Sequence, residues 1–251
     1  MKTLQNAMAA LSMIADSSEP VAVAEIGKRL DLPRSSASRL MSSLRTGGLV
    51  EQDAKSRRYS PGPLAWRLGV GYHAVGYDAE LIEQAMMSLT LATGFTSWMA
   101  VLNSANIVLL RQHQGQVPSQ FTVRLGQSLP AHATAVGKAL LSRLPDSAIS
   151  ALYDDRLPRE TDHTIATPLA LLTDIRNIRS KGYAASAQEA FPGVISVGGA
   201  IYGAVSNCAI GLSLSFPVGL GDPEVVAALL TDALRHVGRE LGDHYWLGTV
   251  T

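Results

Sequence analysis

The sequence has very little cysteine: Cys208 is the only one among 251 residues. An intrachain disulfide needs two cysteines, and a cysteine-based zinc finger needs at least two. Both are therefore excluded. A chain without disulfides suits a reducing compartment, so we expect a cytoplasmic protein that is stabilised by its own packed cores.

Long hydrophobic runs are also missing. No segment approaches the roughly 20 apolar residues that are needed to span a bilayer. The first six residues are polar for the most part and lack the apolar run of a signal peptide, and a helical pattern of Leu4, Met8 and Leu11 follows directly. No membrane partner is expected.

The sequence patterns of common enzyme classes are missing as well. There is no Gly-x-Ser-x-Gly elbow, no His-Glu-x-x-His helix and no dinucleotide-binding glycine pattern behind a strand. Gly137-Lys138 resembles the end of a phosphate-binding loop, but His132 replaces the first glycine and Ala139 replaces the residue that would hold magnesium. No catalytic residue, metal ligand or cofactor is predicted.

The net charge is zero, but the charges are unevenly distributed. Residues 1–70 contain ten Lys and Arg against six Asp and Glu, whereas the remainder contains eleven against fifteen. A chain of this length is long enough for two domains. This division is typical of a DNA-binding module joined to a module that does not bind DNA.

Two short amphipathic helices are predicted in the basic part. Val23, Ile26 and Leu30 are spaced to form one buried stripe, and Ala37, Leu40, Met41 and Leu44 repeat this spacing after a break. Pro33 suits the first position of the second helix. The other face of that helix carries short hydroxyls and arginines, which suit base edges and phosphates, so we predict a helix-turn-helix. The predicted DNA contacts from this helix are Arg34, Ser35, Ser36, Ser38, Arg39 and Ser42.

A basic hairpin is predicted to follow. Gly47-Gly48 ends the helix, and residues 49–50 and 58–60 are typical of two strands around a polar tip. This hairpin would be the wing of a winged helix-turn-helix, and Lys55, Arg57 and Arg58 could neutralise phosphates beside the groove. The alternative is a solvated turn in an ordinary helical domain.

The rest of the chain predicts a mixed domain with an antiparallel sheet flanked by helices. Strands are expected at 95–102, 107–112, 183–188, 194–202 and 209–216. Helices are expected at 134–144 and 167–180, with further helices starting at Asp78 and Asp222, which would be their N-caps. The predicted domains are 1–62 (winged helix-turn-helix), 63–77 (linker helix) and 78–251, and the fold class is α+β.

Two features of this second domain indicate a ligand. Ser213 and Ser215 alternate with leucines in one strand, so both hydroxyls face the same side. The small-residue stretch 132–139 enters a helix and could offer free N–H groups to an anion. Together they favour a small organic acid, although the serines could equally bond to backbone or water.

At these residues the chain resembles the IclR family of bacterial transcription regulators. In the N-terminal part the likeness is carried by Leu32-Pro33-Arg34-Ser35-Ser36, Arg39-Leu40 and Arg58-Tyr59. In the C-terminal part it is carried by residues 129–141, Gly182-Tyr183, Glu189, Gly193-Val194 and residues 211–215. The most specific string is His-Ala-Thr-Ala-x-Gly-Lys-Ala, at residues 132–139.

The resemblance implies a GAF-like effector domain, a homodimer or homotetramer that dimerises through its DNA-binding domains, and pseudo-palindromic operators in double-stranded DNA near metabolic genes. It also implies a pocket. Effector contacts are expected from Ala135, Val136, Ser186, Ser196, Ser213 and Ser215, to which we add His132. Family members often have an acidic residue in place of Ser186 and a cysteine in place of Ser196.

The sequence thus predicts a DNA-binding transcriptional regulator, a repressor of a metabolic operon, that responds to a small organic-acid effector. Two alternatives stay open. The C-terminal domain could serve only for assembly, or the chain could be an enzyme that acts on a carboxylic acid.

Overall fold

The computed structural model describes residues 2–70, 76–118, 123–203 and 207–248. It divides into two compact units, residues 1–73 and 74–251, which we call the N-terminal and C-terminal units. The linker helix predicted for residues 63–77 falls partly on residues 71–75, outside the described residues. Its described part is α4, Pro63–Val70.

The N-terminal unit is a winged helix-turn-helix. Its elements are α1 (Lys2–Asp16), α2 (Val23–Arg29), α3 (Arg34–Thr46), β1 (Val50–Gln52), β2 (Tyr59–Pro61) and α4. The predicted apolar stripes supply its core, because Ile26 of α2 and Met41 of α3 are fully buried with Ala10 of α1. Strands β1 and β2 form the antiparallel hairpin that was predicted as the wing, with Gln52 opposite Tyr59.

The prediction for Pro33 was wrong by one residue. Pro33 has a ψ of 143°, which is extended rather than helical, so α3 begins at Arg34. Its carbonyl nevertheless accepts the first N–H bonds of the helix, from Ser36 and Ala37. Pro33 is therefore the N-cap of α3.

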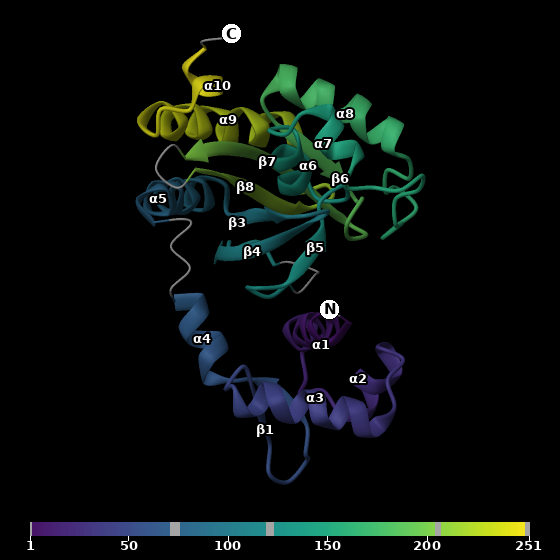
Figure 1. The fold of residues 1–251 in the computed structure, drawn as a ribbon. Helices are drawn as coiled ribbons and strands as arrows, with labels where there is room; N and C mark the ends of the chain where they lie inside the picture. The colour runs from purple at the N-terminus through teal and green to yellow at the C-terminus, as the bar shows by residue number, and fades with distance from the viewer. Residues whose placement is uncertain (1, 71–75, 119–122, 204–206, 249–251) are drawn as a thin grey trace. The chain divides into compact units, whose positions relative to one another are not determined.

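The C-terminal unit is built on one six-stranded sheet in the order β5-β4-β3-β8-β7-β6, and every neighbouring pair is antiparallel. The strands are β3 (Thr96–Asn103), β4 (Asn106–His113), β5 (Ser128–Pro130), β6 (Ala184–Ala187), β7 (Val194–Gly203) and β8 (Cys208–Pro217). Figure 1 shows β3, β8 and β7 crossing the middle of this unit. The predicted α+β class with an antiparallel sheet is confirmed.

Helices cover both faces of this sheet. They are α5 (Gly76–Thr93), α6 (Ala135–Leu141), α7 (Asp146–Ser150), α8 (Pro168–Lys181), α9 (Pro223–Glu240) and α10 (His244–Leu247). One core lies between the sheet and α5 with α9, and a second lies between the sheet and α6, α7 and α8 (Figure 1). Side chains alternate between the cores, so Leu212 and Leu214 of β8 belong to the first core and the serines between them face α6.

One predicted helix cap in this unit was wrong. Helix α5 begins at Gly76, so Asp78 lies in its first turn and not at its N-cap, and it is buried. The acidic residue still lies near the positive end of the helix, where a negative charge is favoured. In the described parts of the chain, no helix combines the length and apolar character that crossing a membrane requires.

Candidate DNA-binding surface and ligand cavity

The outer face of α3 presents the predicted DNA contacts. Arg34, Ser35, Ser38, Arg39 and Ser42 are exposed and Ser36 is half-buried, whereas the opposite face of α3 is buried. A shallow surface hollow is lined by Arg39, Ser42, Ser43 and Thr46. Arg45 is also exposed on this helix, and its spacing of seven residues from Ser38 and three from Ser42 could have identified it in the sequence.

Two hydroxyls in the hollow are already used. Ser43 donates to the carbonyl of Arg39 at 3.1 Å and Thr46 donates to the carbonyl of Ser42 at 2.9 Å. Such bonds to the preceding turn satisfy the hydroxyl protons within the helix. Within the hollow, the groups that can reach outward are therefore the guanidinium of Arg39 and the hydroxyl of Ser42.

The wing tip is organised by Asp53. Its Oδ1 accepts the backbone N–H groups of Lys55 and Ser56, at 3.2 and 2.7 Å, and the hydroxyl of Ser56 at 2.7 Å. The hydrogen bonds from Ser56 hold the pKa of Asp53 below its usual value. Arg57 closes the turn with a φ of 59°, and both Lys55 and Arg57 are exposed. The turn held by Asp53 thus exposes the positively charged side chains of Lys55 and Arg57.

Arg58, which was predicted to contact a phosphate, also makes contacts within the N-terminal unit. Its Nη1 donates to the carbonyl of Pro20 at 2.7 Å, and its Nη2 lies 3.2 Å from Oε1 of Glu25. The guanidinium thus ties the wing to the start of α2, because both partners lie there. These contacts engage two of the guanidinium nitrogens, but an arginine has five N–H donors and the side chain of Arg58 remains 43 % exposed, so its phosphate contact stays a prediction.

The C-terminal unit contains a cavity between the sheet and the start of α6. The centre of a water molecule can occupy about 40 Å³ inside it, and the empty space amounts to about 400 Å³ when the open mouth is included. The lining residues are Trp98, Ile107, Leu109, Val123, Leu129, Thr134, Ala135, Val136, Ser186, Ala190, Phe191, Ser196, Ser213 and Ser215. Six of the seven residues that were predicted to contact an effector lie together here; His132 does not.

The cavity is apolar except for hydroxyls, and no charged residue lines it among those that the structure describes. Ser186 donates to the carbonyl of Ala133 at 2.9 Å. Ser196 and Ser215, opposite each other on β7 and β8, have their hydroxyl oxygens 2.8 Å apart. One proton of that pair stays available, as does the proton of Ser213, which has no hydrogen-bond partner among the described residues. The polar end of the cavity can therefore donate two hydroxyl bonds.

A glycine allows helix α6 to approach this site. A Cβ built on Gly198 of β7 would lie 2.7 Å from the backbone nitrogen of Val136, closer than real contacts allow. Thr134 caps the helix, because its hydroxyl accepts the N–H of Gly137 at 3.2 Å. Since Gly198 pairs with Ser213 in the sheet, the first turn of α6 is held directly over the serine strands.

His132 is buried beside the cavity and does not line it. Its Nε2 is 2.8 Å from the carbonyl of Pro158, and its ring stands edge-on to Tyr153. Burial lowers the pKa of His132 below its usual value, and burial raises the pKa of Tyr153 to about 12. These contacts join two loops through His132, and the effector contact predicted for it stays a prediction.

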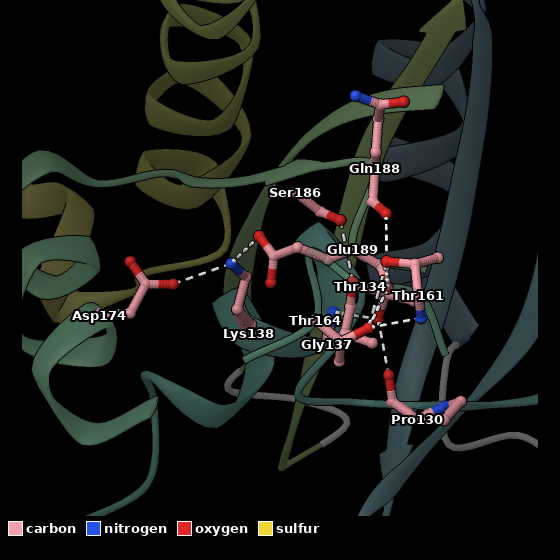
Figure 2. A network of polar contacts seen from close by, with 11 residues as sticks. Pro130, Thr134, Gly137, Lys138, Thr161, Thr164, Asp174, Ser186, Gln188 and Glu189 are labelled. Carbon is pink, nitrogen blue, oxygen red and sulfur yellow. Dashed lines mark hydrogen bonds and ion pairs between the residues drawn. The ribbon is translucent and has the colours of Figure 1, made fainter. Parts of the chain in front are cut away.

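Beside the cavity lies a buried ion-pair network that the sequence did not reveal (Figure 2). The Nζ of Lys138 is 2.8 Å from Oδ2 of Asp174 and 2.8 Å from Oε1 of Glu189. The side chain of Lys138 is only 2 % exposed. Its partners are 36 and 51 residues away in the chain, so sequence spacing gives no signal for the network.

Each of the two units matches the model of a known protein family. Residues 3–54 match the model of the IclR helix-turn-helix domain, and residues 79–241 match the model of the bacterial transcriptional regulator IclR C-terminal domain. The chain is 30 % identical over 242 residues to the HTH-type transcriptional regulator BhcR of Paracoccus denitrificans, covering 96 % of this chain and 86 % of that protein. It is 28 % identical to the HTH-type transcriptional repressor AllR of Escherichia coli K12, covering 96 % and 90 % of the two chains.

Two solved structures share the fold. An IclR transcriptional regulator from Alicyclobacillus acidocaldarius has a TM-score of 0.79 at 20 % identity, with 99 % of each chain covered. An IclR homolog from Microbacterium hydrocarbonoxydans, crystallised with 4-hydroxybenzoate, has a TM-score of 0.77 at 20 % identity, with 96 % of this chain and 99 % of that chain covered.

The matching models and relatives are transcriptional regulators and not enzymes, which confirms the prediction that the chain is not an enzyme. The winged N-terminal unit and the cavity-bearing C-terminal unit correspond to the two matched domains. The chain belongs to the IclR family of DNA-binding transcriptional regulators, with the family's helix-turn-helix domain followed by its C-terminal domain.

Proposed function

We propose that this regulator represses a metabolic operon and that a small organic acid, bound in the C-terminal cavity, changes its affinity for DNA. The parts we assign are residues 1–62 for DNA binding, 63–77 as a linker and 78–251 for the effector. One observation carries the proposal: the N-terminal unit has an exposed basic helix, and the C-terminal unit has an apolar cavity that is also lined by serine hydroxyls.

On the DNA side, the exposed face of α3 has the side chains that major-groove recognition uses. Arg39 can make a bidentate contact with guanine, and the short hydroxyls of Ser35, Ser38 and Ser42 can reach bases or phosphates. Arg34 and Ser36 lie in the first turn, where a recognition helix meets the groove. Lys55 and Arg57 at the wing tip would contact phosphates.

On the effector side, the two available hydroxyl protons suit one carboxylate. A carboxylate oxygen accepts such bonds, and the first N–H groups of α6, at Ala135 and Val136, have no carbonyl partner within the helix. Because no basic side chain lines the cavity in the described chain, the anion would be held by neutral donors alone. Burying it there is favourable only if those bonds are made.

The remainder of the cavity favours an acid with an apolar body. Trp98 and Phe191 contribute aromatic walls, with aliphatic side chains from β4 and β5. The serines lie side by side on the sheet, because Ser186 pairs with Ser196 and Ser196 pairs with Ser215. A structural relative was crystallised with 4-hydroxybenzoate, which is an acid with an apolar body. That compound is therefore a sensible first probe.

We further propose that the regulator acts in the cytoplasm as a homodimer or homotetramer on pseudo-palindromic DNA. A dimer would place two recognition helices in successive major grooves, about 34 Å apart. The effector would then act by changing that spacing through the linker, which couples the two sites.

A thermal-shift screen with small carboxylic acids, 4-hydroxybenzoate first, tests the effector assignment. An acid at 100 times its dissociation constant should stabilise the protein by about 2.7 kcal/mol. The double variant Ser213→Ala/Ser215→Ala should lose that shift yet bind operator DNA, found by genomic footprinting, as tightly as the wild type. A panel without any shift would favour a C-terminal unit that serves only for assembly.

A further inference from the structure

The loop between β6 and β7, residues 188–193, forms one wall of the cavity. Ala190 and Phe191 at its centre line the cavity. The loop begins and ends in left-handed backbone, with a φ of 60° at Gln188 and 75° at Gly193. A non-glycine residue in this conformation is uncommon and persists only when its surroundings hold it. Something must therefore hold this loop in place.

One set of contacts fixes the base of the loop. The carbonyl of Gln188 accepts the hydroxyl of Thr161 at 2.7 Å, and the carbonyl of Glu189 accepts the hydroxyl of Thr164 at 2.6 Å. The side-chain oxygen of Gln188 accepts the N–H of Gly193 at 2.9 Å, which closes the loop on itself. These bonds shape the loop but attach it to another loop, and not to the opposite side of the cavity.

The loop is attached to helix α6 by the ion pair between Glu189 and Lys138 (Figure 2). Lys138 follows Ala135 and Val136 on α6, which are cavity residues as well. The pair thus joins the two walls, α6 and the 188–193 loop. Asp174 of α8 holds the same ammonium from its other side and is 34 % exposed, so the network reaches the surface there.

Burying this ion pair costs desolvation free energy, which suggests that it has a function other than stability. The Oε2 of Glu189 is buried with no hydrogen-bond partner among the described residues. Burial raises the pKa of Glu189 even though Lys138 acts in the opposite direction. A buried ion pair is weak evidence for stability, because apolar replacements often do as well. Its position between two cavity walls offers a better reason for its presence.

We propose that Lys138 and Glu189 are positioning residues of the effector site: their ion pair is a tether that holds the Ala190–Phe191 wall against α6. The ligand interpretation rests on the proposed function, but the tether is a property of the free protein. With the tether cut, the loop stays attached at its base and Phe191 still packs against the core, but local opening of residues 188–193 becomes easier.

Hydrogen–deuterium exchange on the full-length protein without any ligand tests the tether. Lys138→Met keeps the length of the side chain and removes the charge, and Glu189→Ala removes the other partner. Both should make the amides of 188–194 exchange more than about tenfold faster, because local opening becomes easier. Glu189→Gln retains an acceptor for Lys138 and should restore much of the protection.

The matched control is Arg143→Met. This variant breaks another buried ion pair of the same unit, the one between Arg143 and Asp243. Neither of these two residues lines the cavity. The variant should lower the unfolding temperature without selectively releasing 188–194. Wild-type exchange of this segment in Lys138→Met and Glu189→Ala, or an equal release in Arg143→Met, would overturn the proposal. Since no effector is used, this result is independent of whether any acid is found to bind.

Discussion

At the scale of single residues, a side chain that is already hydrogen-bonded within the protein is more often structural, and one that is exposed with free donors is a better functional candidate. Arg39 and Arg58 are both arginines of the basic unit, but Arg58 is held by Pro20 and Glu25 whereas Arg39 is exposed beside an open hollow. The two contacts within the unit restrict the orientation of the Arg58 guanidinium and leave it fewer donors for DNA than Arg39 has. Arg39 is therefore the better candidate for base recognition.

Arg39→Ala should weaken binding to the operator and relax its base preference. A bidentate arginine contact discriminates against the wrong base by about 1–3 kcal/mol. Fluorescence anisotropy with operator and random duplexes measures this directly. The matched variant Lys55→Ala, at the wing tip, should weaken both duplexes alike and reduce the salt slope by about one. An equal loss on both duplexes for Arg39→Ala would refute its role in base recognition.

The sequence predicted some of these residue-scale features and not others, for a physical reason. The strict alternation of strands placed Ser213 and Ser215 on one side of β8, and both line the cavity. The partners of Arg58 and His132, by contrast, are backbone carbonyls of Pro20 and Pro158. Every residue has a carbonyl, so such a partner leaves no mark in the sequence, and only the fold reveals it.

At the scale of elements, local capping chemistry predicted the starts of two long helices, α8 and α9, but not that of α5. Helix α8 begins with the Thr167 cap and Pro168 and ends at Gly182, whose φ of 85° suits glycine. Helix α9 begins at the Asp222 cap with Pro223. The elements that were not predicted, β5, α7 and α10, are three to five residues long. Elements this short contain too few residues for a periodic spacing of apolar residues to be recognised in the sequence.

Gly198→Ala tests the close approach of α6 to the sheet. The new methyl would overlap the backbone at Val136, so we expect a loss of about 1–3 kcal/mol in the free energy of unfolding, as for other overpacked cores. Urea denaturation measures this. Gly69→Ala, with nothing within 4 Å of the added carbon, is the control and should be neutral or slightly stabilising. Wild-type stability of Gly198→Ala would mean that α6 does not lie this close.

At the scale of the whole molecule, the balanced charge conceals two different units. The basic excess of residues 1–70 is cancelled by the acidic excess of the remainder, so the net charge alone would argue against DNA binding. Both modules could be predicted from the sequence because their patterns are local. Assembly could not be predicted in this way, since an interface joins surfaces of two chains and has no period of its own.

The proposed dimer makes a prediction about the operator. If two recognition helices bind half-sites one helical turn apart, inserting five base pairs between the half-sites rotates one of them to the opposite face of the DNA. Only one helix could then make its specific contacts. Mobility-shift titration should show an affinity at least about tenfold lower, since even one or two lost base contacts cost that much.

The matched control for this operator is a substitution of the same five central base pairs at constant length. It keeps the spacing and should cost much less than the insertion, unless bending of the central sequence contributes strongly to binding. The insertion acts only on a protein that bridges both half-sites at once. Equal affinity for the inserted and native operators would show that each chain binds DNA by itself, and a ligand-dependent change of spacing could then have no effect.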